Sequence, residues 1–380
     1  MKLVYCIPSL DSAGGTERVL TNKVNYLAEH YGWEIHIVLT ERQKGAPYFP
    51  LHPSVRVVEL DLDFRADYGC GILGKSVAYV RKIRTYRREL EKLLMHLRPD
   101  ITTSLLSHEI DFLHKLRDGS KKIGENHFYK DFRLGFIAMG RRSSLLRRCV
   151  ARLRNRQLIA CVRRLDELVV LTEDDARAWH EMRYKTVITN ALTCFPERVS
   201  DGGAKRVVAA GRYVPQKGYD LLLRTWEKVR REFPGWELVI YGDGEARPEL
   251  ERYAATHGLD DVRLEHAVND VFDRFAESSL SVLSSRFEGF GLVVIEAMAC
   301  GLPVVAFDCK CGPGEIIRNG EDGLLVPAGD CEALAEGMER LMRDEGLRRR
   351  MGRAARSNVE RYRMERVMKQ WVALYERLLV

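Results

Sequence analysis

The sequence has no long hydrophobic run. None of its apolar stretches approaches the roughly 18–20 residues that a membrane-spanning helix needs. The first eight residues turn polar too soon for a secretory signal peptide and lack a small-residue cleavage site. We therefore expect them to form a buried strand, and we expect the chain to be cytoplasmic.

The chain also has few features of a disulfide-bonded or metal-binding protein. Its nine cysteines are an odd number, scattered through expected strands and helices, which suits reduced thiols packed as small hydrophobic groups. Cys309 and Cys311 form a close pair, but no second pair or nearby histidine completes a zinc site. No paired aspartates follow a strand to hold Mg²⁺ or Mn²⁺ against phosphates. We expect no metal and no other cofactor.

Acidic residues are scarce in two stretches of the first half. Residues 1–190 hold 33 basic and 23 acidic residues, whereas the remainder holds 28 and 31. Residues 141–164 contain nine arginines and no acid, and residues 74–98 contain eight basic residues and two glutamates. Basic amphipathic helices suit an anionic membrane surface. A solvated charged face over an ordinary core stripe remains the alternative. No recognition motif accompanies the charge, so we expect no nucleic-acid partner.

The length of 380 residues indicates two domains. Short apolar segments alternate with helical patterns, the periodicity stops at 195–204, and the alternation then restarts. In the first half we expect strands at 2–7, 34–39, 55–60, 101–106, 121–125, 167–171 and 186–189, and helices at 15–30, 74–97, 141–165 and 174–182. In the second half we expect strands at 206–210, 237–241, 262–266, 280–284, 303–307 and 323–326, and helices at 217–232, 246–257, 269–278, 291–299, 330–343 and across 345–380.

This alternation predicts an α/β fold of two doubly wound, Rossmann-like domains with mostly parallel sheets, facing across a cleft. We expect domains at 1–194 and 195–360, with a C-terminal helix at 361–380 that packs back on the first domain. Ligands of such sheets bind at the carboxyl ends of the strands.

The strongest motif is Ser285-Arg286-Phe287-Glu288-Gly289-Phe290-Gly291 followed by a helix to Cys300. A helix N-terminus offers free N–H groups, and the glycines let an anion approach. Glu288 lies in the loop beside this anion site. Glu296 lies on an otherwise apolar stretch of the helix, where a carboxylate is costly unless something bonds it. The hydroxyls of a ribose would do so, and a buried arginine is the alternative.

Two further loops follow strands in the second half. Arg212 and Lys217 lie in a loop bounded by Gly211 and Gly218, and two cations at a strand end suit a diphosphate. Gly242 follows the next strand, where it fits either the edge of a nucleotide pocket or a plain turn.

The E-x7-E spacing of Glu288 and Glu296, the G-R-x4-K-G loop and the Gly301-Leu302-Pro303 that follows the helix resemble retaining glycosyltransferases of the GT-B type, family 4 (glycosyl transferases group 1). Order and spacing match over nearly the whole chain. The resemblance implies that Glu288 contacts the donor sugar and Glu296 the ribose. It also implies that Arg212 and Lys217 hold the diphosphate, which the backbone amides of Phe290, Gly291 and Leu292 also face.

For the first domain the resemblance implies that the loop carrying Gly14 and Gly15 lies beside the donor phosphates and the acceptor. It also implies a histidine near the reacting sugar. His127 ends the strand 121–125 and is our first choice, and His108, after the neighbouring strand, is the second.

The function that this resemblance implies is retaining, metal-independent transfer of a hexosyl unit from a nucleotide-diphosphate sugar, with UDP the expected nucleotide. The expected acceptor is a glycan or a lipid-linked glycan in the synthesis of a surface polysaccharide or lipopolysaccharide, at the inner face of the membrane. Two alternatives remain: a nucleotide-sugar epimerase of the same architecture and a non-catalytic binding subunit.

Overall fold

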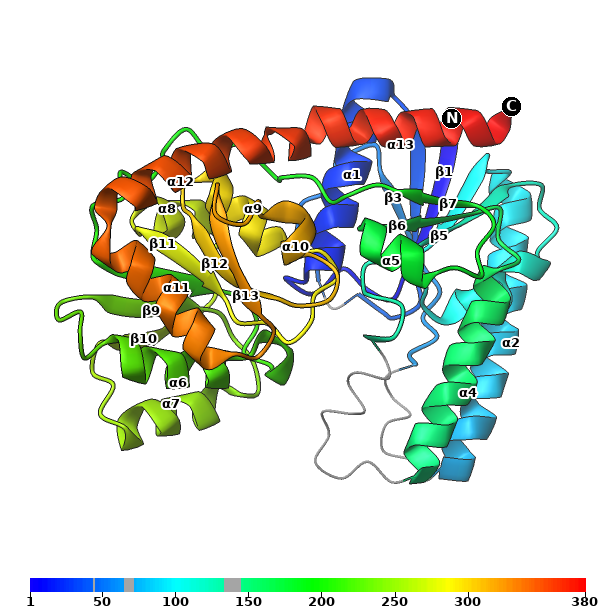
Figure 1. Ribbon diagram of the computed structural model, residues 1–380. Coiled ribbons are helices and arrows are strands. Elements are labelled where there is room, and N and C mark those ends of the chain that lie inside the picture. The colour runs from blue at the N-terminus through cyan, green and yellow to red at the C-terminus, as the bar shows by residue number, and fades with distance from the viewer. Residues whose placement is uncertain (44, 65–71, 133–144) are drawn as a thin grey trace. The chain divides into compact units, whose positions relative to one another are not determined.

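The computed structural model describes residues 1–43, 45–64, 72–132 and 145–380, and the chain divides into two compact units (Figure 1). Unit 1 consists of Met1–Thr193 with Glu365–Val380, and unit 2 of Cys194–Met364. The first boundary thus follows residue 193, where we expected 194, and the returning segment starts at 365 instead of 361.

The centre of unit 1 is a seven-stranded sheet in the order β3-β2-β1-β4-β5-β6-β7. Every neighbouring pair of its strands is parallel. The strands are β1 (Lys2–Ile7), β2 (Glu34–Leu39), β3 (Arg56–Glu59), β4 (Ile101–Ser104), β5 (Lys121–Glu125), β6 (Glu167–Val170) and β7 (Lys185–Val187).

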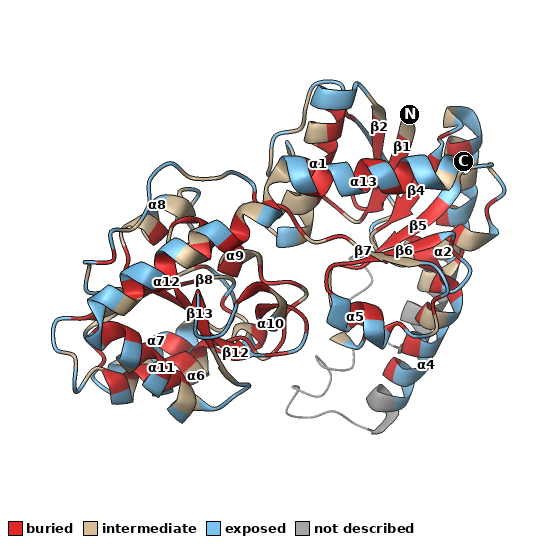
Figure 2. Cartoon of the chain, turned by 45° about the horizontal axis from the view of Figure 1, so that its top comes forward, coloured by how far each residue is buried: buried red, intermediate tan, exposed pale blue. Residues whose placement is uncertain are grey.

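Helices cover this sheet, so its central strands are buried (Figure 2). The helices are α1 (Gly15–Tyr31), α2 (Ile72–Leu97), α4 (Leu145–Val162), α5 (Glu173–Ala178) and α13 (Met364–Leu379), with short 3-10 helices η2 (His108–Asp111) and η3 (Leu113–Lys115). Helix α1 places Leu20, Val24 and Leu27 in the core at the spacing of an amphipathic helix. It ends at Gly32, which adopts the left-handed conformation with φ 62° that glycine allows at a helix end.

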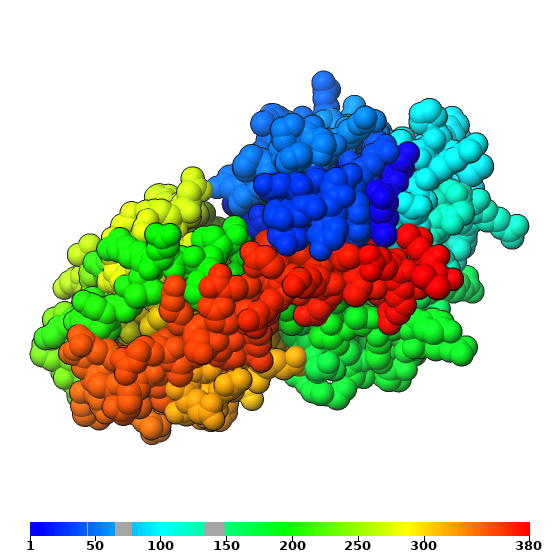
Figure 3. Space-filling model, turned by 90° about the horizontal axis from the view of Figure 1, so that it is seen from above, coloured from blue at the N-terminus to red at the C-terminus, as the bar shows by residue number. Residues whose placement is uncertain are grey.

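Helix α13, the last helix of the chain, packs on the first residues of the chain. Figure 3 shows it in red beside the blue N-terminal segment of unit 1. The Tyr375 and Tyr5 hydroxyls are 2.6 Å apart, and the Trp371 and Tyr375 rings are both buried. Residues almost a full chain length apart therefore share one core.

Unit 2 has a six-stranded parallel sheet in the order β10-β9-β8-β11-β12-β13. Its strands are β8 (Arg206–Ala210), β9 (Glu237–Tyr241), β10 (Val262–Glu265), β11 (Leu280–Leu283), β12 (Val304–Asp308) and β13 (Gly323–Pro327). Its helices are η4 (Pro215–Lys217), α6 (Tyr219–Val229), α7 (Arg247–Thr256), α8 (Val271–Ala276), α9 (Leu292–Ala299), α10 (Pro313–Ile316), α11 (Cys331–Arg343), α12 (Glu345–Asn358) and η5 (Val359–Tyr362).

Each sheet reverses its strand order at one point, between β1 and β4 in unit 1 and between β8 and β11 in unit 2. At such a point the loops that leave the carboxyl ends of two adjacent strands diverge, which leaves room for a ligand. The loops after β8 and β11 are the two that carry the strongest motifs of the sequence.

The elements agree with the expected ranges to within a few residues, and the α/β fold of two doubly wound units is confirmed. Three expectations were wrong in detail. Helix α5 ends at Ala178 and not at 182, because the chain turns at Trp179. The expected helix across 345–380 breaks at Arg363, whose ψ of 141° is extended. The expected strand 101–106 ends at Ser104, and the chain then turns to form η2. The start of the expected helix at 141 lies outside the described residues.

In the part of the chain that the structure describes, no helix is both long and apolar enough to span a bilayer.

Candidate functional site

The loops after β8 and β11 are joined to each other by several hydrogen bonds. Arg286 N donates to Gln216 O at 2.8 Å, and Gln216 Nε2 donates to Phe287 O at 3.0 Å. The guanidinium of Arg286 forms a fork with Asp220 at 2.8 and 2.7 Å. These bonds bring residues 71 positions apart in the sequence into one rigid cluster.

Gly218 lets these two loops approach closely. It adopts φ 65°, and a Cβ built on it would lie 2.1 Å from Ser284 O. Any larger residue at 218 would therefore clash with the backbone of the other loop and would also strain its own backbone.

Lys217 and Glu288 form the centre of this cluster. Lys217 Nζ lies 2.8 Å from Glu288 Oε1, and the hydroxyl of Ser285 donates to the same oxygen at 2.6 Å. The side chains are 16% and 7% exposed, so the pair is sheltered but remains within reach of a ligand. The structure thus brings together two residues that the sequence placed in separate motifs.

Arg212 lies on the same loop as Lys217 and is exposed. Among the described residues its side chain makes no hydrogen bond or ion pair, while its backbone carbonyl accepts from Val214 N at 2.8 Å. A guanidinium in this state can bind an anion without breaking an existing pair.

Helix α9 starts directly after Gly291, the N-cap, which has φ 99°. Helix geometry leaves the first N–H groups of α9, those of Leu292 and Val293, without partners inside the helix, whereas Val294 N donates to Gly291 O at 2.9 Å. Phe290 is buried, and its ring meets Tyr362 edge to face at 5.5 Å between centroids. The backbone of Gly312 packs so closely on this loop that a Cβ there would lie 2.2 Å from Phe290 O. The loop is therefore held in place before any ligand binds.

Glu296 lies in α9 and is only 3% exposed. Its helix neighbours Val294, Ile295, Ala297 and Met298 are buried apolar residues. After burial itself, the Glu296 carboxylate is the largest cause that raises the pKa of the Cys300 thiol, to about 12. A ribose contact for Glu296 stays a prediction.

Gly242, after β9, packs on the loop of Arg212. A Cβ on Gly242 would lie 1.9 Å from Gly211 O, and Tyr213 N donates to Asp243 O at 2.8 Å. This glycine therefore has a structural use as a point of close backbone approach, and a nucleotide contact for it stays a prediction.

In unit 1 the loop after β1 leads into α1. Gly14 is the N-cap of α1 with φ −71°, and Gly15 is the first helical residue. The carboxylate of Glu17 bends back toward this turn, where Ser12 Oγ donates to it at 2.8 Å. A Cβ on Gly14 would lie 2.1 Å from Glu17 Oε2, a flexible side-chain atom.

His127 follows β5 and lies in a buried charged cluster. Its Nε2 is 3.1 Å from Glu125 Oε1, with side-chain exposures of 4% and 1%, although the ring is turned so that Nε2 makes no aligned hydrogen bond. The other oxygen of Glu125 accepts from Lys23 Nζ. Burial raises the pKa of the Glu125 carboxyl, but Lys23 and His127 outweigh it and hold this pKa at about 2.

His108, the second choice, has a different setting. Its ring stacks on Phe64 at 4.1 Å between centroids and meets Tyr79 edge to face at 5.8 Å. The imidazole is thus part of an aromatic cluster on η2. Its role beside a sugar stays a prediction.

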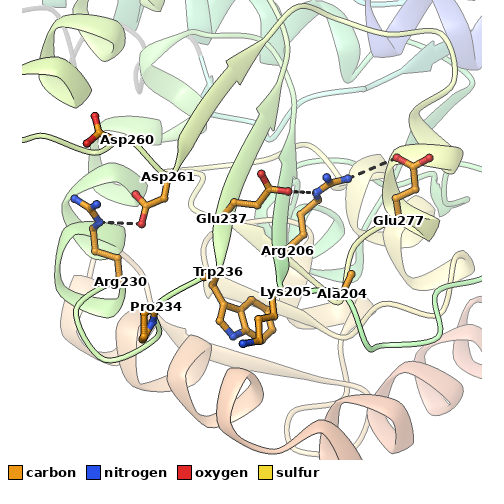
Figure 4. Close-up of a pocket in the computed structure, with 11 residues that line it drawn as sticks. Ala204, Lys205, Arg206, Arg230, Pro234, Trp236, Glu237, Asp260, Asp261 and Glu277 are labelled. Carbon is orange, nitrogen blue, oxygen red and sulfur yellow. Dashed lines mark hydrogen bonds and ion pairs between the residues drawn. The ribbon is translucent and has the colours of Figure 1, made fainter.

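Figure 4 shows a hollow in unit 2 at the amino ends of strands β8 and β9. The loops that carry Arg212, Lys217 and Glu288 leave the carboxyl ends of the strands. Four of the charged side chains that line the hollow form two pairs: Arg206 with Glu237 at 2.6 Å, and Arg230 with Asp261 at 2.9 Å. None of the expected site residues lines this hollow.

Sequence reasoning missed four residues that hold the site residues: Ser285, Gln216, Glu125 and Lys23. Lys23 carried the one available signal, because a lysine on the apolar stripe of α1 is unusual. Gln216 bonds to the loop after a separate strand, which no local pattern reveals. Ser285 and Glu125 are near neighbours of Glu288 and His127 in the sequence, but only the folded loops show that these side chains meet. No three His, Cys, Asp or Glu side chains within the described ranges are grouped as metal ligands.

Residues 194–358 match the family described as Glycosyl transferases group 1. The chain is 29% identical over 379 residues to an uncharacterized glycosyltransferase of Haemophilus influenzae, which covers 97% of this chain and 98% of the relative. It is 28% identical over 382 residues to the amylovoran biosynthesis glycosyltransferase AmsD of Erwinia amylovora, with 97% and 98% covered. A further match is 38% identical over 224 residues to the exopolysaccharide phosphotransferase SCO2592 of Streptomyces coelicolor. It covers 57% of this chain but only 24% of that protein.

Solved structures share the fold at low identity. Sucrose-phosphate synthase from Thermosynechococcus elongatus has a TM-score of 0.80 at 20% identity, with 99% of this chain and 98% of that chain covered. A mutant of TarM from S. aureus, in complex with Fondaparinux, alpha-GlcNAc-glycerol and UDP, has a TM-score of 0.77 at 16% identity, with 98% and 99% covered.

Proposed function

Because residues 194–358 form a glycosyltransferase group 1 domain in a chain of GT-B fold, we propose that the protein is a retaining, metal-independent hexosyltransferase. Its donor is a nucleotide-diphosphate sugar, with UDP as the nucleotide, and its acceptor is a glycan or a lipid-linked glycan. We propose that it acts in the synthesis of a surface polysaccharide or lipopolysaccharide, on the cytoplasmic side of the membrane.

The observation that carries this proposal is the cluster of Lys217, Glu288 and the N-terminus of α9, with the exposed Arg212 on the loop of Lys217. As the bond between the sugar and the diphosphate breaks, negative charge grows on the departing diphosphate. The N–H groups of Leu292 and Val293 are donors already held in place at the start of α9, and Lys217 and Arg212 add two cations that stabilise this charge.

Glu288 has the complementary task. Its carboxylate accepts hydrogen bonds, so it can bind hydroxyls of the donor sugar and fix the ring relative to the leaving group. In the present structure Lys217 and Ser285 hold this carboxylate at 2.8 and 2.6 Å. A diphosphate that attracts Lys217 would free part of the carboxylate for the sugar.

We assign the sugar-facing histidine of unit 1 to His127, which follows the carboxyl end of β5, the end where parallel sheets bind ligands. His108 is the weaker candidate because its ring is stacked in the cluster with Phe64 and Tyr79. The donor choice is supported by the UDP named with the TarM mutant, and the pathway by the amylovoran biosynthesis named for AmsD.

We also propose that α2 and α4 bring the enzyme to an anionic membrane surface. On α4, Arg152 and Arg156 are exposed, and between them Leu153 is 63% exposed. Val150 on the same helix is 49% exposed. Leu158 and Val162, two further apolar residues of the basic stretch 141–164, belong to the core of unit 1. The helix thus offers arginines with two apolar side chains between and beside them, which suits insertion at a lipid headgroup layer.

A panel of nucleotide sugars tests the donor site. Thermal shift identifies the donor that binds, and its slow hydrolysis and its transfer to acceptors are then measured. Lys217→Ala should lower kcat/KM by about 10²–10³-fold, because it removes a cation from the developing charge. Its melting temperature should fall by no more than about 4 °C.

The matched control is Lys228→Ala, which removes a lysine of α6 from its surface pair with Glu332 of α11 and should leave transfer unchanged. Near-normal transfer by the Lys217 variant would contradict the diphosphate assignment. Conversion of the donor to an isomer without any acceptor would identify an epimerase instead, and absence of any nucleotide-sugar binding would identify a non-catalytic subunit.

A further inference from the structure

Lys23, Glu125 and His127 form a buried chain of ionisable side chains in unit 1. Lys23 comes from α1, and Glu125 is the last residue of β5. Lys23 donates to Glu125 Oε2, and Glu125 Oε1 lies 3.1 Å from His127 Nε2. All three side chains are no more than 4% exposed. The carboxylate of Glu125 therefore has a cation on one oxygen and an imidazole beside the other.

The lysine of this chain is enclosed by aromatic rings. Lys23 Nζ lies 3.8 Å from the centroid of Trp371 and 5.0 Å from that of Tyr5. Tyr5 in turn meets Tyr375 through their hydroxyls at 2.6 Å. Because Trp371 and Tyr375 both belong to α13, the C-terminal helix supplies the wall that fixes the ammonium group.

The loop after His127 is fixed from the other side. The carboxylate of Asp175, in the first turn of α5, accepts from Asn126 Nδ2 and from Lys130 N, both at 2.8 Å. With residues 126 and 130 held in this way, the backbone of His127 has little freedom. The remaining freedom is the orientation of its ring, and Glu125 is the charged group beside that ring.

Stability alone does not account for this arrangement. A buried ion pair recovers little more than the cost of removing both charges from water, and apolar residues of similar volume usually serve as well. Burial lowers the pKa of Lys23, because the ammonium group has lost its water. Glu125 nevertheless stays ionised because its pKa is about 2. A permanent carboxylate beside an imidazole sets the position of the ring proton.

We propose that Glu125 is the positioning residue of His127, and that α13 holds Glu125 in place through Trp371 and Lys23. The last helix of the chain then helps to position His127. This inference rests on the proposed function, in which His127 faces the reacting sugar. We further propose that Glu125 favours the tautomer of His127 with the proton on Nε2, so that His127 Nδ1 is an acceptor.

Three variants and one matched control test this inference. Glu125→Gln removes the charge beside His127, and Lys23→Met/Glu125→Gln removes both buried charges, so that no ion is left without its partner. Trp371→Leu opens the wall around Lys23. The control is Glu167→Gln. Glu167 is another buried strand glutamate that bonds to α13, through Arg377 at 2.9 Å, but it begins β6 and pairs in register with Ile123, two positions before the end of β5.

The catalytic readout compares kcat with the KM of the donor. Both Glu125 variants should lower kcat on the order of 10²-fold, because a misplaced ring loses its alignment with the sugar. The donor KM should change less than about twofold, because the donor-binding residues lie in unit 2. Trp371→Leu should lower kcat in the same direction by a smaller factor, and the control should retain the wild-type kcat. Wild-type kcat in the folded double variant would overturn the inference.

A second readout is independent of transfer activity. In protein labelled with ¹⁵N-histidine, the ring resonances of His127 are assigned from their loss in His127→Gln. They should show the Nε2–H tautomer in the wild type and in the control, and a changed tautomer balance in both Glu125 variants. If the wild type fails to transfer sugar but His127 responds in this way, the proposed function is wrong and the positioning role stands. Unchanged His127 resonances in both Glu125 variants would overturn the positioning role.

Discussion

Two lysine–glutamate pairs, Lys217 with Glu288 and Lys23 with Glu125, differ in how deeply they are buried. This difference indicates different roles. Lys217 and Glu288 are 16% and 7% exposed, so a ligand can reach them and take over one partner. Lys23 and Glu125 are each 1% exposed, so water and ligands do not replace either partner. The first pair therefore suits binding of a substrate, whereas the second suits holding a neighbour in place.

The Glu125 carboxyl should make unfolding depend on pH in acid. Its pKa falls from 4.5 to about 2 on folding. Below 4.5 the unfolded state binds the proton first, so this contribution to stability is present above that pH and is lost as the pH falls toward 2. The shift corresponds to about 3 kcal/mol.

Urea unfolding of the wild type and of Lys23→Met/Glu125→Gln, at about pH 6 and about pH 3, measures this contribution. Because about pH 3 is still above the folded-state pKa, the free energy of unfolding should fall by about 2 kcal/mol more in the wild type than in the double variant. Equal losses in both proteins would contradict the ionised state that we assign to Glu125.

At the scale of elements, the site of unit 2 depends on two loops locked together by short backbone contacts. Gly218 and Gly312 each bring a loop within a distance that a side chain would block. The hydrogen bonds of Gln216 and the fork of Arg286 on Asp220 then fix the register. Helix α9 can direct its N–H groups at a ligand because the loop before it has no freedom to move away.

Gly218→Ala tests the close approach, with Gly258→Ala as its control. Both glycines have a left-handed backbone, with φ 65° and 60°, but nothing lies within 4 Å of a Cβ at Gly258, whereas one at Gly218 meets Ser284 O at 2.1 Å. The two variants therefore share the backbone strain and differ in the clash. Gly218→Ala should lose about 1–3 kcal/mol more stability in chemical denaturation and also lose donor binding. Equal stability of the two variants would argue against the locked loops.

At the scale of the whole molecule, the first and last segments of the chain belong to the same unit. Unit 1 is built from residues 1–193 and from 365–380, with unit 2 inserted between them. Tyr5 in the first strand and Tyr375 in the last helix share one buried contact. Helices α2 and α4 of the same unit lie side by side, joined through Tyr79, Asp111 and Arg154 (Figure 1).

Membrane binding by α4 is tested by charge reversal of the full chain. Arg152→Glu/Arg156→Glu should weaken binding to vesicles of anionic lipid at low salt by at least about 2 kcal/mol, on the order of 30-fold, since each surface arginine contributes roughly 1 kcal/mol. The control, Arg350→Glu/Arg353→Glu, reverses two exposed arginines of α12 in unit 2 and should bind like the wild type. Sedimentation with vesicles measures both, and equal binding of the two variants would contradict the assignment to α4.

The sequence by itself determined the alternation of strands and helices, since apolar periodicity is a local property. Strands such as 2–7, 34–39, 121–125, 206–210 and 237–241 have the bounds expected from it. It also placed Arg212, Lys217, Glu288 and Glu296 after strands or on a helix, because glycine-bounded loops and E-x7-E spacing are visible in the chain. The family match over 194–358 agrees with that resemblance.

Only the tertiary structure decided which of these residues meet. The 2.8 Å pair of Lys217 and Glu288 joins loops 71 positions apart, and the tie from Trp371 through Lys23 to Glu125 joins the last helix to α1 and β5. It also decided that Leu158 and Val162 belong to the core while Leu153 faces outward. The physical reason is that pairing energies depend on distance and burial, which follow from how elements pack and not from their order in the chain.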